Sequence, residues 1–264
     1  MNRSCLLVFV FSAMLLAAGC VGLKHVQKTN IEGRQVEYAV AGEGRPTIVF
    51  ESGMGRNLNT WKPIFDSLSK CASVFASNRP GYGHSSLKNA PRTIREAVVQ
   101  LHQNLNAIGL KPPYILVGHS AGGLYINMFA RLFPDETAGV VFLDASHPDQ
   151  FEYFRKHQSA LYNILITSIK KGKRRYEESI VKSAHSDFKS VPPFPDVPIA
   201  VLTAGEKSSP LETVKMRKKW LEFQKELAGL SEKSTHVIVE KSGHFIHKDS
   251  PDIVIGEIIR LAEF

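Results

Sequence analysis

Residues 118–122 read Gly-His-Ser-Ala-Gly and place a serine in the middle of a short, glycine-bounded segment. An apolar run, residues 114–117, comes directly before it, and residues 124–132 with helical spacing follow. Small residues at both ends of such a pentapeptide permit a tight turn from a strand into a helix, and the turn exposes the serine hydroxyl at the edge of a sheet. The spacing therefore predicts that Ser120 is a nucleophile.

A serine nucleophile needs a base, because its hydroxyl is weakly nucleophilic at its ordinary pKa. The chain has 10 histidines. A strand-to-helix turn of this kind pairs with a histidine in the loop after the last strand, which narrows the choice to His244 and His247. His244 lies just past the apolar run 236–240 and is the predicted base, with His247 as the second choice.

The rest of the chain must supply the elements that bring these residues together. Its hydrophobic content of 43% and charged content of 22% are typical of a globular protein, and we expect one domain. Short apolar runs alternate with segments of helical spacing, which predicts a mostly parallel sheet with helices on both faces and sites at the carboxyl ends of the strands. Strands are expected at residues 35–41, 47–51, 72–76, 114–117, 140–143, 199–203 and 236–240, and helices at 61–68, 94–108, 124–132, 211–227 and 253–261.

One long segment, residues 148–195, interrupts this alternation. It has helical patterns at residues 151–162 and 176–183 but no convincing strand, and it is too long for an ordinary connection. We interpret it as an inserted lid. Residues 151–190 hold nine basic and four acidic side chains, which accounts for most of the net charge of +8. The excess is interpreted either as a solvated helical face or as a contact with anionic lipid headgroups.

Five stretches of the sequence resemble the α/β-hydrolase family and occur in the order that the family uses. They are residues 50–55, 78–85, 118–123, 141–147 and 242–246. The resemblance implies an α/β-hydrolase fold, with an eight-stranded, mostly parallel sheet and the order nucleophile, acid, histidine along the chain. It implies no cofactor.

The family resemblance leaves two positions for the acid. Most members place it after the seventh strand, where Glu206 is the only nearby carboxylate in this chain, and some place it after the sixth strand, where this chain has Asp144. A carboxylate beside an apolar strand end is costly without a partner, and an imidazole would be one. We therefore favour Asp144, which would orient His244, over Glu206. An interpretation in which Asp144 only caps a turn stays open.

Backbone amides must also stabilise the oxyanion that acyl transfer generates. One donor is expected at Ala121, which follows the nucleophile at the start of a helix. The resemblance implies that the other comes from residues 52–55, Ser-Gly-Met-Gly, where the Met54 amide is the best candidate. A plain turn is the alternative interpretation of these glycines.

These residues predict hydrolysis of a carboxylic ester, thioester or lactone, with a small-molecule or lipid-like substrate. In the family that the chain resembles, epoxide hydrolases and dehalogenases use an aspartate as the nucleophile. A serine at this position therefore disfavours those two activities. A C–C bond hydrolase or lyase on the same scaffold, and a non-catalytic binding protein, remain as alternatives. His244, His247 and Asp249 lie close together in the sequence, but this cluster lacks a third ligand with the spacing of a metal site, so we predict none. We also expect no nucleic-acid partner.

The first 19 residues are predicted to be a signal peptide. A single basic residue, Arg3, precedes an apolar run, residues 6–19, that is too short to span a bilayer. Residues 16–20, Leu-Ala-Ala-Gly-Cys, resemble a bacterial lipobox, which implies that Cys20 is lipidated and that the mature domain is 20–264. The protein would then be held on a membrane face outside the cytoplasm. A secreted or periplasmic protein is the alternative.

Overall fold

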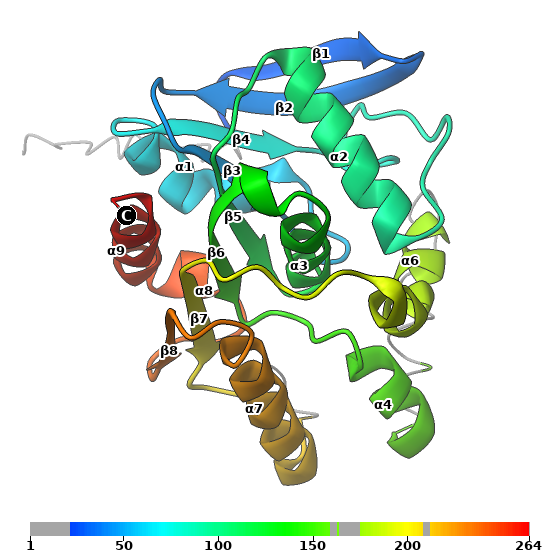
Figure 1. Cartoon of the computed structure of the whole chain (residues 1–264), viewed down its shortest axis with the longest axis vertical. Coiled ribbons are helices and arrows are strands. Elements are labelled where there is room, and N and C mark those ends of the chain that lie inside the picture. The colour runs from blue at the N-terminus through cyan, green and yellow to red at the C-terminus, as the bar shows by residue number, and fades with distance from the viewer. Residues whose placement is uncertain (1–21, 159–162, 164–174, 208–211, 264) are drawn as a thin grey trace, which may run out of the picture.

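An eight-stranded sheet forms the centre of the molecule, with the strand order β1-β2-β4-β3-β5-β6-β7-β8. The computed structural model describes residues 22–158, 163, 175–207 and 212–263. β2 pairs antiparallel with β1 and β4, and all other neighbouring strands are parallel (Figure 1). The strands are β1 (Val26–Ile31), β2 (Arg34–Ala41), β3 (Thr47–Glu51), β4 (Ser73–Ser77), β5 (Tyr114–His119), β6 (Thr137–Leu143), β7 (Ile199–Ala204) and β8 (Ser234–Val239). The predicted fold class is confirmed.

β1 is the strand that sequence reasoning missed. Its residues, Val-Gln-Lys-Thr-Asn-Ile, lack the apolar run used to identify the other strands, and most of them are exposed. It lies at the edge of the sheet, where a strand needs no buried face and a charged side chain such as Lys28 helps to keep other chains from pairing with it. The first strand identified from the sequence, residues 35–41, corresponds to β2.

Two layers of helices cover the sheet (Figure 1). α1 (Lys62–Leu68), α8 (Ile246–Asp249) and α9 (Pro251–Ala262) lie on one face, and α2 (Ile94–Ile108), α3 (Gly122–Leu132) and α7 (Val214–Ala228) lie on the other. Successive side chains of a strand point to opposite faces, so β3 contributes to both cores. Ile48 and Phe50 pack into the core under α1 and α9, whereas Val49 packs into the core under α2 and α3.

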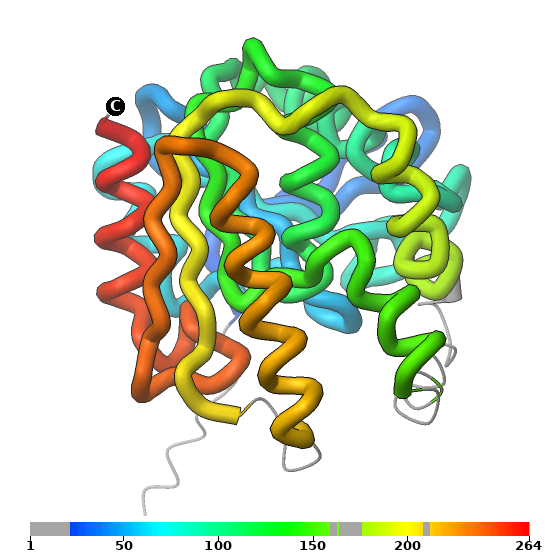
Figure 2. The backbone as a smooth tube through the Cα atoms, turned by 60° about the horizontal axis from the view of Figure 1, so that its bottom comes forward, coloured from blue at the N-terminus to red at the C-terminus, as the bar shows by residue number. Residues whose placement is uncertain are grey.

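The connection from β6 to β7 contains α4 (Gln150–His157), α6 (Arg175–Asp187) and the short 3-10 helix η4 (Phe188–Ser190). Figure 2 shows α4 beside α6, away from the β7 and β8 edge of the sheet. α6 also packs against α2, and its buried residues Ile180 and Ala184 belong to the same core as α2 and α3. Residues 170–174, which hold four of the nine basic side chains of the segment 151–190, lie outside the described residues, as do the predicted signal peptide and Cys20.

The described part of the chain also contains the 3-10 helices η1 (Leu58–Trp61) before α1 and η2 (Pro134–Glu136) before β6. Trp61 at the end of η1 is fully buried and stacks on Phe50 of β3, with 4.6 Å between the ring centroids. None of the helices in the described part of the chain is long and apolar enough to cross a membrane.

Candidate active site

Ser120 occupies the turn between β5 and α3, as predicted. Its backbone φ is 52°, in the left-handed region that residues other than glycine rarely adopt. Three backbone hydrogen bonds hold this conformation: the Ser120 N–H donates to the Leu143 carbonyl at 3.1 Å, and the Ser120 carbonyl accepts from Gly123 at 2.9 Å and Ser146 at 2.8 Å. A strained residue that its surroundings fix so completely is a frequent feature of functional sites.

Glycines at both ends of this turn allow helix α3 to begin directly against the sheet. A Cβ atom on Gly122 would lie 2.1 Å from the carbonyl oxygen of Glu51 on β3. A Cβ atom on Gly118 would lie 2.7 Å from the carbonyl oxygen of Gly122 itself. No larger residue fits at either position without moving backbone, which is the close packing that the sequence predicted from the glycine spacing.

His244 and Asp144 are in direct contact although they are 100 positions apart in the chain. The His244 Nδ1 atom lies 2.7 Å from the Asp144 Oδ2 atom. The Asp144 side chain is completely buried at the end of β6, whereas 25% of the His244 side chain is exposed. An ionised carboxylate can only accept hydrogen bonds, so Nδ1–H of His244 is the donor in this contact, and Nε2 is the ring nitrogen that does not face Asp144.

Two further donors satisfy the buried carboxylate of Asp144. Its Oδ1 atom accepts from the indole N–H of Trp220 at 2.8 Å and from the backbone N–H of Ala204 at 3.2 Å. Sequence reasoning missed Trp220, because nothing in the sequence distinguishes it from other residues of a helix. Its contact with Asp144 exists only because α7 packs beside β7. The alternative acid, Glu206, is exposed, and no hydrogen bond joins its side chain to His244 among the described residues.

Two buried histidines surround His244, and both stay neutral at neutral pH. His247, the second choice for the base, is fully buried and its Nε2 atom lies 3.0 Å from the Thr60 hydroxyl. Burial, assisted by the positive charge of Lys248, lowers the pKa of His247 to about 3. Burial likewise lowers the pKa of His119 well below its usual range. The His247 ring also packs against Trp61, with 4.8 Å between the ring centroids.

His119, the residue before Ser120, connects the two halves of the site. Its Nε2 atom donates to the backbone carbonyl of His244 at 2.8 Å, and the two imidazole rings are 4.6 Å apart. This contact fixes the loop that carries His244 next to the turn that carries Ser120. Sequence reasoning assigned no role to His119, although its place inside the pentapeptide was a signal that could have drawn attention to it.

The two predicted oxyanion donors, Met54 and Ala121, belong to the loop after β3 and to the start of α3. We call residues 52–55 the oxyanion loop. It follows β3 and lies against the turn, because a Cβ atom on Gly53 would be 3.2 Å from the Ser120 Cβ. Met54 in this loop is half-buried. Ala121 is the N-cap of α3, where backbone amides have no acceptor within the helix and carry the positive end of its dipole.

This arrangement has the parts that acyl transfer requires. A hydroxyl lies at a strained turn, an imidazole in the loop after β8 is held by a buried carboxylate, and amides at a helix start and in a loop can receive negative charge. Within the described residues, no group of three or more His, Cys, Asp or Glu side chains is arranged to hold a metal ion.

Comparisons with known proteins agree with this architecture. A family model described as an alpha/beta hydrolase fold matches residues 46–165. The uncharacterized protein YqjL of Bacillus subtilis is 28% identical over 221 residues, which cover 81% of this chain and 82% of that protein. An esterase of Mycobacterium tuberculosis is 24% identical over 257 residues, which cover 83% of each chain.

Among solved structures, the enol-lactonase from Burkholderia xenovorans LB400 superimposes with a TM-score of 0.67 at 16% sequence identity. The superposition covers 90% of this chain and 100% of the lactonase. At this level of identity the likeness concerns the fold alone. Together with the order and direction of the eight strands, the family model and this likeness show that the chain has the α/β-hydrolase fold.

Proposed function

We propose that the protein is a serine hydrolase that cleaves carboxylic esters, thioesters or lactones. Ser120 would be the nucleophile, His244 the general base and Asp144 the acid that orients it. The observation that supports this most strongly is the 2.7 Å contact between His244 Nδ1 and Asp144 Oδ2, together with the φ of 52° at Ser120. Chain order and spacing alone do not require that contact.

In the proposed reaction, Nε2 of His244 takes the proton from Ser120 as the serine oxygen attacks the acyl carbon. The amides of Met54 and Ala121 would stabilise the resulting oxyanion. The bond to the leaving group then breaks, and the imidazolium of His244 returns the proton to that group. Water, activated by the same imidazole, releases the acid and restores Ser120. Asp144 stays ionised throughout and stabilises the imidazolium.

The substrate class draws support from the comparisons. The relative from Mycobacterium tuberculosis is described as an esterase, and the structural neighbour from Burkholderia xenovorans as an enol-lactonase. Both names describe acyl–oxygen bond cleavage, the chemistry for which a serine, a histidine and oxyanion donors are suited. The proposal therefore concerns an acyl–oxygen or acyl–sulfur bond in a small or lipid-like substrate.

Labelling with a fluorophosphonate probe tests the nucleophile. The wild-type protein should react and Ser120→Ala should not, whereas Ser67→Ala, an exposed serine on α1, should react like the wild type. Labelling or esterase activity that persists in Ser120→Ala would contradict the proposal. A panel of nitrophenyl esters of increasing chain length then defines the acyl preference. A labelled Ser120 with no turnover of esters, thioesters or lactones would favour C–C bond cleavage instead.

We also propose that the mature protein is anchored by lipid at Cys20 and lies on a membrane face outside the cytoplasm. The support comes from the apolar run and the lipobox-like residues 16–20. Labelled palmitate should be incorporated into the wild-type protein and not into Cys20→Ala. Label that remains on the variant would refute the anchor.

A further inference from the structure

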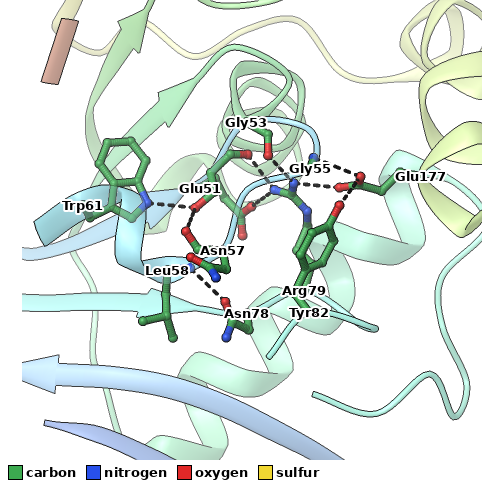
Figure 3. A network of polar contacts seen from close by, with 11 residues as sticks. Glu51, Gly53, Gly55, Asn57, Leu58, Trp61, Asn78, Arg79, Tyr82 and Glu177 are labelled. Atoms are coloured by element: carbon green, nitrogen blue, oxygen red, sulfur yellow. Dashed lines mark hydrogen bonds and ion pairs between the residues drawn. The ribbon is translucent and has the colours of Figure 1, made fainter. Parts of the chain in front are cut away.

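The buried guanidinium group of Arg79 lies against the oxyanion loop (Figure 3). Arg79, in the loop after β4, donates from Nη1 to the carbonyl oxygen of Ser52 at 2.6 Å and from Nη2 to the carbonyl oxygen of Gly53 at 2.8 Å. Only 7% of its side chain is exposed. Two consecutive carbonyl groups of the oxyanion loop therefore point at one cation.

Glu177 of helix α6 contacts both this cation and the loop itself (Figure 3). Its Oε1 atom lies 2.8 Å from Arg79 Nη2, and its Oε2 atom accepts from the backbone N–H of Gly55 at 3.2 Å. The Tyr82 hydroxyl donates to the same Oε2 atom. Only 3% of the Glu177 side chain is exposed. One carboxylate from the connection between β6 and β7 thus accepts from three donors around the oxyanion loop.

These contacts fix the peptide units on both sides of Met54. In a trans peptide the carbonyl group and the following N–H point in opposite directions. Because the Gly53 carbonyl points toward Arg79, the N–H of Met54 points away from Arg79. The next amide, Gly55 N–H, points toward Glu177. Neither peptide can rotate without breaking a buried hydrogen bond.

The same arrangement makes the Met54 amide a stronger donor. A cation bound to a carbonyl oxygen polarises the whole peptide unit, and hydrogen bonds in series strengthen one another in a buried environment. Burial alone would lower the pKa of Arg79, but nearby groups, including Tyr125, Glu177 and Glu51, raise it well above its usual range. Arg79 therefore remains a cation.

We propose that Glu177 is a positioning residue for the reaction, holding Arg79 and the oxyanion loop so that the Met54 amide can receive the oxyanion. The oxyanion loop then depends on docking of α6, which lies outside the alternating strands and helices of the core. This inference rests on the function proposed above.

The variant Glu177→Gln tests it with little change in shape. Arg79, the Gly55 N–H and the Tyr82 hydroxyl all donate to Glu177, so the amide NH2 group of glutamine must face at least one donor. We expect kcat to fall about 10- to 100-fold, with KM within about twofold of the wild type. The control is Glu178→Gln, which removes the same charge one residue further along α6, where Glu178 pairs with Lys182 at 2.6 Å. It should leave kcat unchanged.

A second measurement distinguishes a loss of oxyanion positioning from a general destabilisation of the folded protein. A trifluoromethyl ketone forms a tetrahedral adduct whose oxyanion occupies the same donors as the transition state. Its affinity for Glu177→Gln should fall by the same factor as kcat/KM, whereas a merely structural effect would change KM and the folded fraction. Equal ketone affinity in Glu177→Gln and the wild type would overturn the inference.

Removing one member of a buried ion pair is strongly destabilising, so Glu177→Gln can fail to fold. Tyr82→Phe is the second variant, since it keeps every charge and removes one hydroxyl that donates to Glu177. We expect it to fold and to have a kcat about threefold lower at unchanged KM. A wild-type kcat in the folded Tyr82→Phe variant would overturn the inference. Esterase activity in Ser120→Ala would instead overturn the proposed function, so the two failures are distinguishable.

Discussion

Asp144 illustrates how much of this site depends on satisfying one buried charge. An ionised carboxylate without partners is too costly to bury, and this one has three donors, from His244, Trp220 and Ala204. Each donor comes from a different element, so the position of the carboxylate is determined from several sides. Glu206 lies in solvent and has no such constraint. The contrast favours Asp144 as the acid of the proposed reaction.

Replacing Asp144 by asparagine should lower kcat by about 10³- to 10⁴-fold, because an amide can hold the wrong tautomer of His244 and cannot stabilise its imidazolium. The comparison variant is Glu206→Gln, which should retain wild-type activity. Steady-state kinetics with a nitrophenyl ester measures both. An active Asp144→Asn together with an inactive Glu206→Gln would assign the acid to residue 206.

At the scale of elements, the site forms where several strand ends meet. The turn from β5 into α3 carries Ser120, the end of β6 carries Asp144, and the loop after β8 carries His244. β5, β6, β7 and β8 run parallel, so their carboxyl ends share one edge of the sheet. The contact between α3 and β3 sets how close the oxyanion loop comes to Ser120.

This contact makes a specific prediction for Gly122. An alanine there would bring its Cβ to 2.1 Å from the Glu51 carbonyl oxygen, so α3 must move, and we expect a loss of about 2–4 kcal/mol in the free energy of unfolding together with a large loss of activity. Urea denaturation measures the first effect. Gly256→Ala is the matched control, because it lies on α9 with nothing within 4 Å of the added carbon. It should stabilise the protein by about 0.5–1 kcal/mol. Equal effects of the two substitutions would contradict the packing argument.

At the scale of the whole molecule, the fold buries histidines that it must keep neutral. His119 and His247 lie between the sheet and the helices near the site, and burial is the main reason that the pKa of each is lowered. Below about pH 6.5 the unfolded chain binds protons on these residues that the folded chain does not. These two histidines therefore contribute a fall in the free energy of unfolding as the pH falls through this range.

We expect each buried histidine to contribute a slope of about 1.4 kcal/mol per pH unit, and for His247 the window extends from about pH 6.5 down to about pH 3. The variant His247→Gln keeps a polar partner for Thr60 and should lose that share of the slope in urea denaturation between about pH 5.5 and about pH 4. His157→Gln, which replaces an exposed histidine on α4, should retain it. An unchanged slope in His247→Gln would mean that the folded protein accepts a proton there.

Most of the core could be predicted from local pattern. Apolar runs such as residues 47–51 and 114–117 matched strands within a few residues, because a strand buried on both faces needs a continuous apolar sequence. The edge strand β1 could not be found this way, since most of its residues are exposed and it carries no such run. Trp220 and Glu177 were also missed, because their contacts are with residues far away in the sequence and no local pattern indicates such contacts.

The sequence by itself determined a mostly parallel sheet with helices on both faces, seven of its eight strands and the turn that holds Ser120, because periodicity and glycine spacing are local properties of a chain. It also limited the acid to two carboxylates. Only the tertiary structure decided that Asp144 contacts His244 and that Glu177 contacts the oxyanion loop. It also decided that His119, the residue before Ser120, contacts the loop that carries His244. Those contacts join residues far apart in sequence, and their distances depend on how helices and strands pack rather than on any local preference.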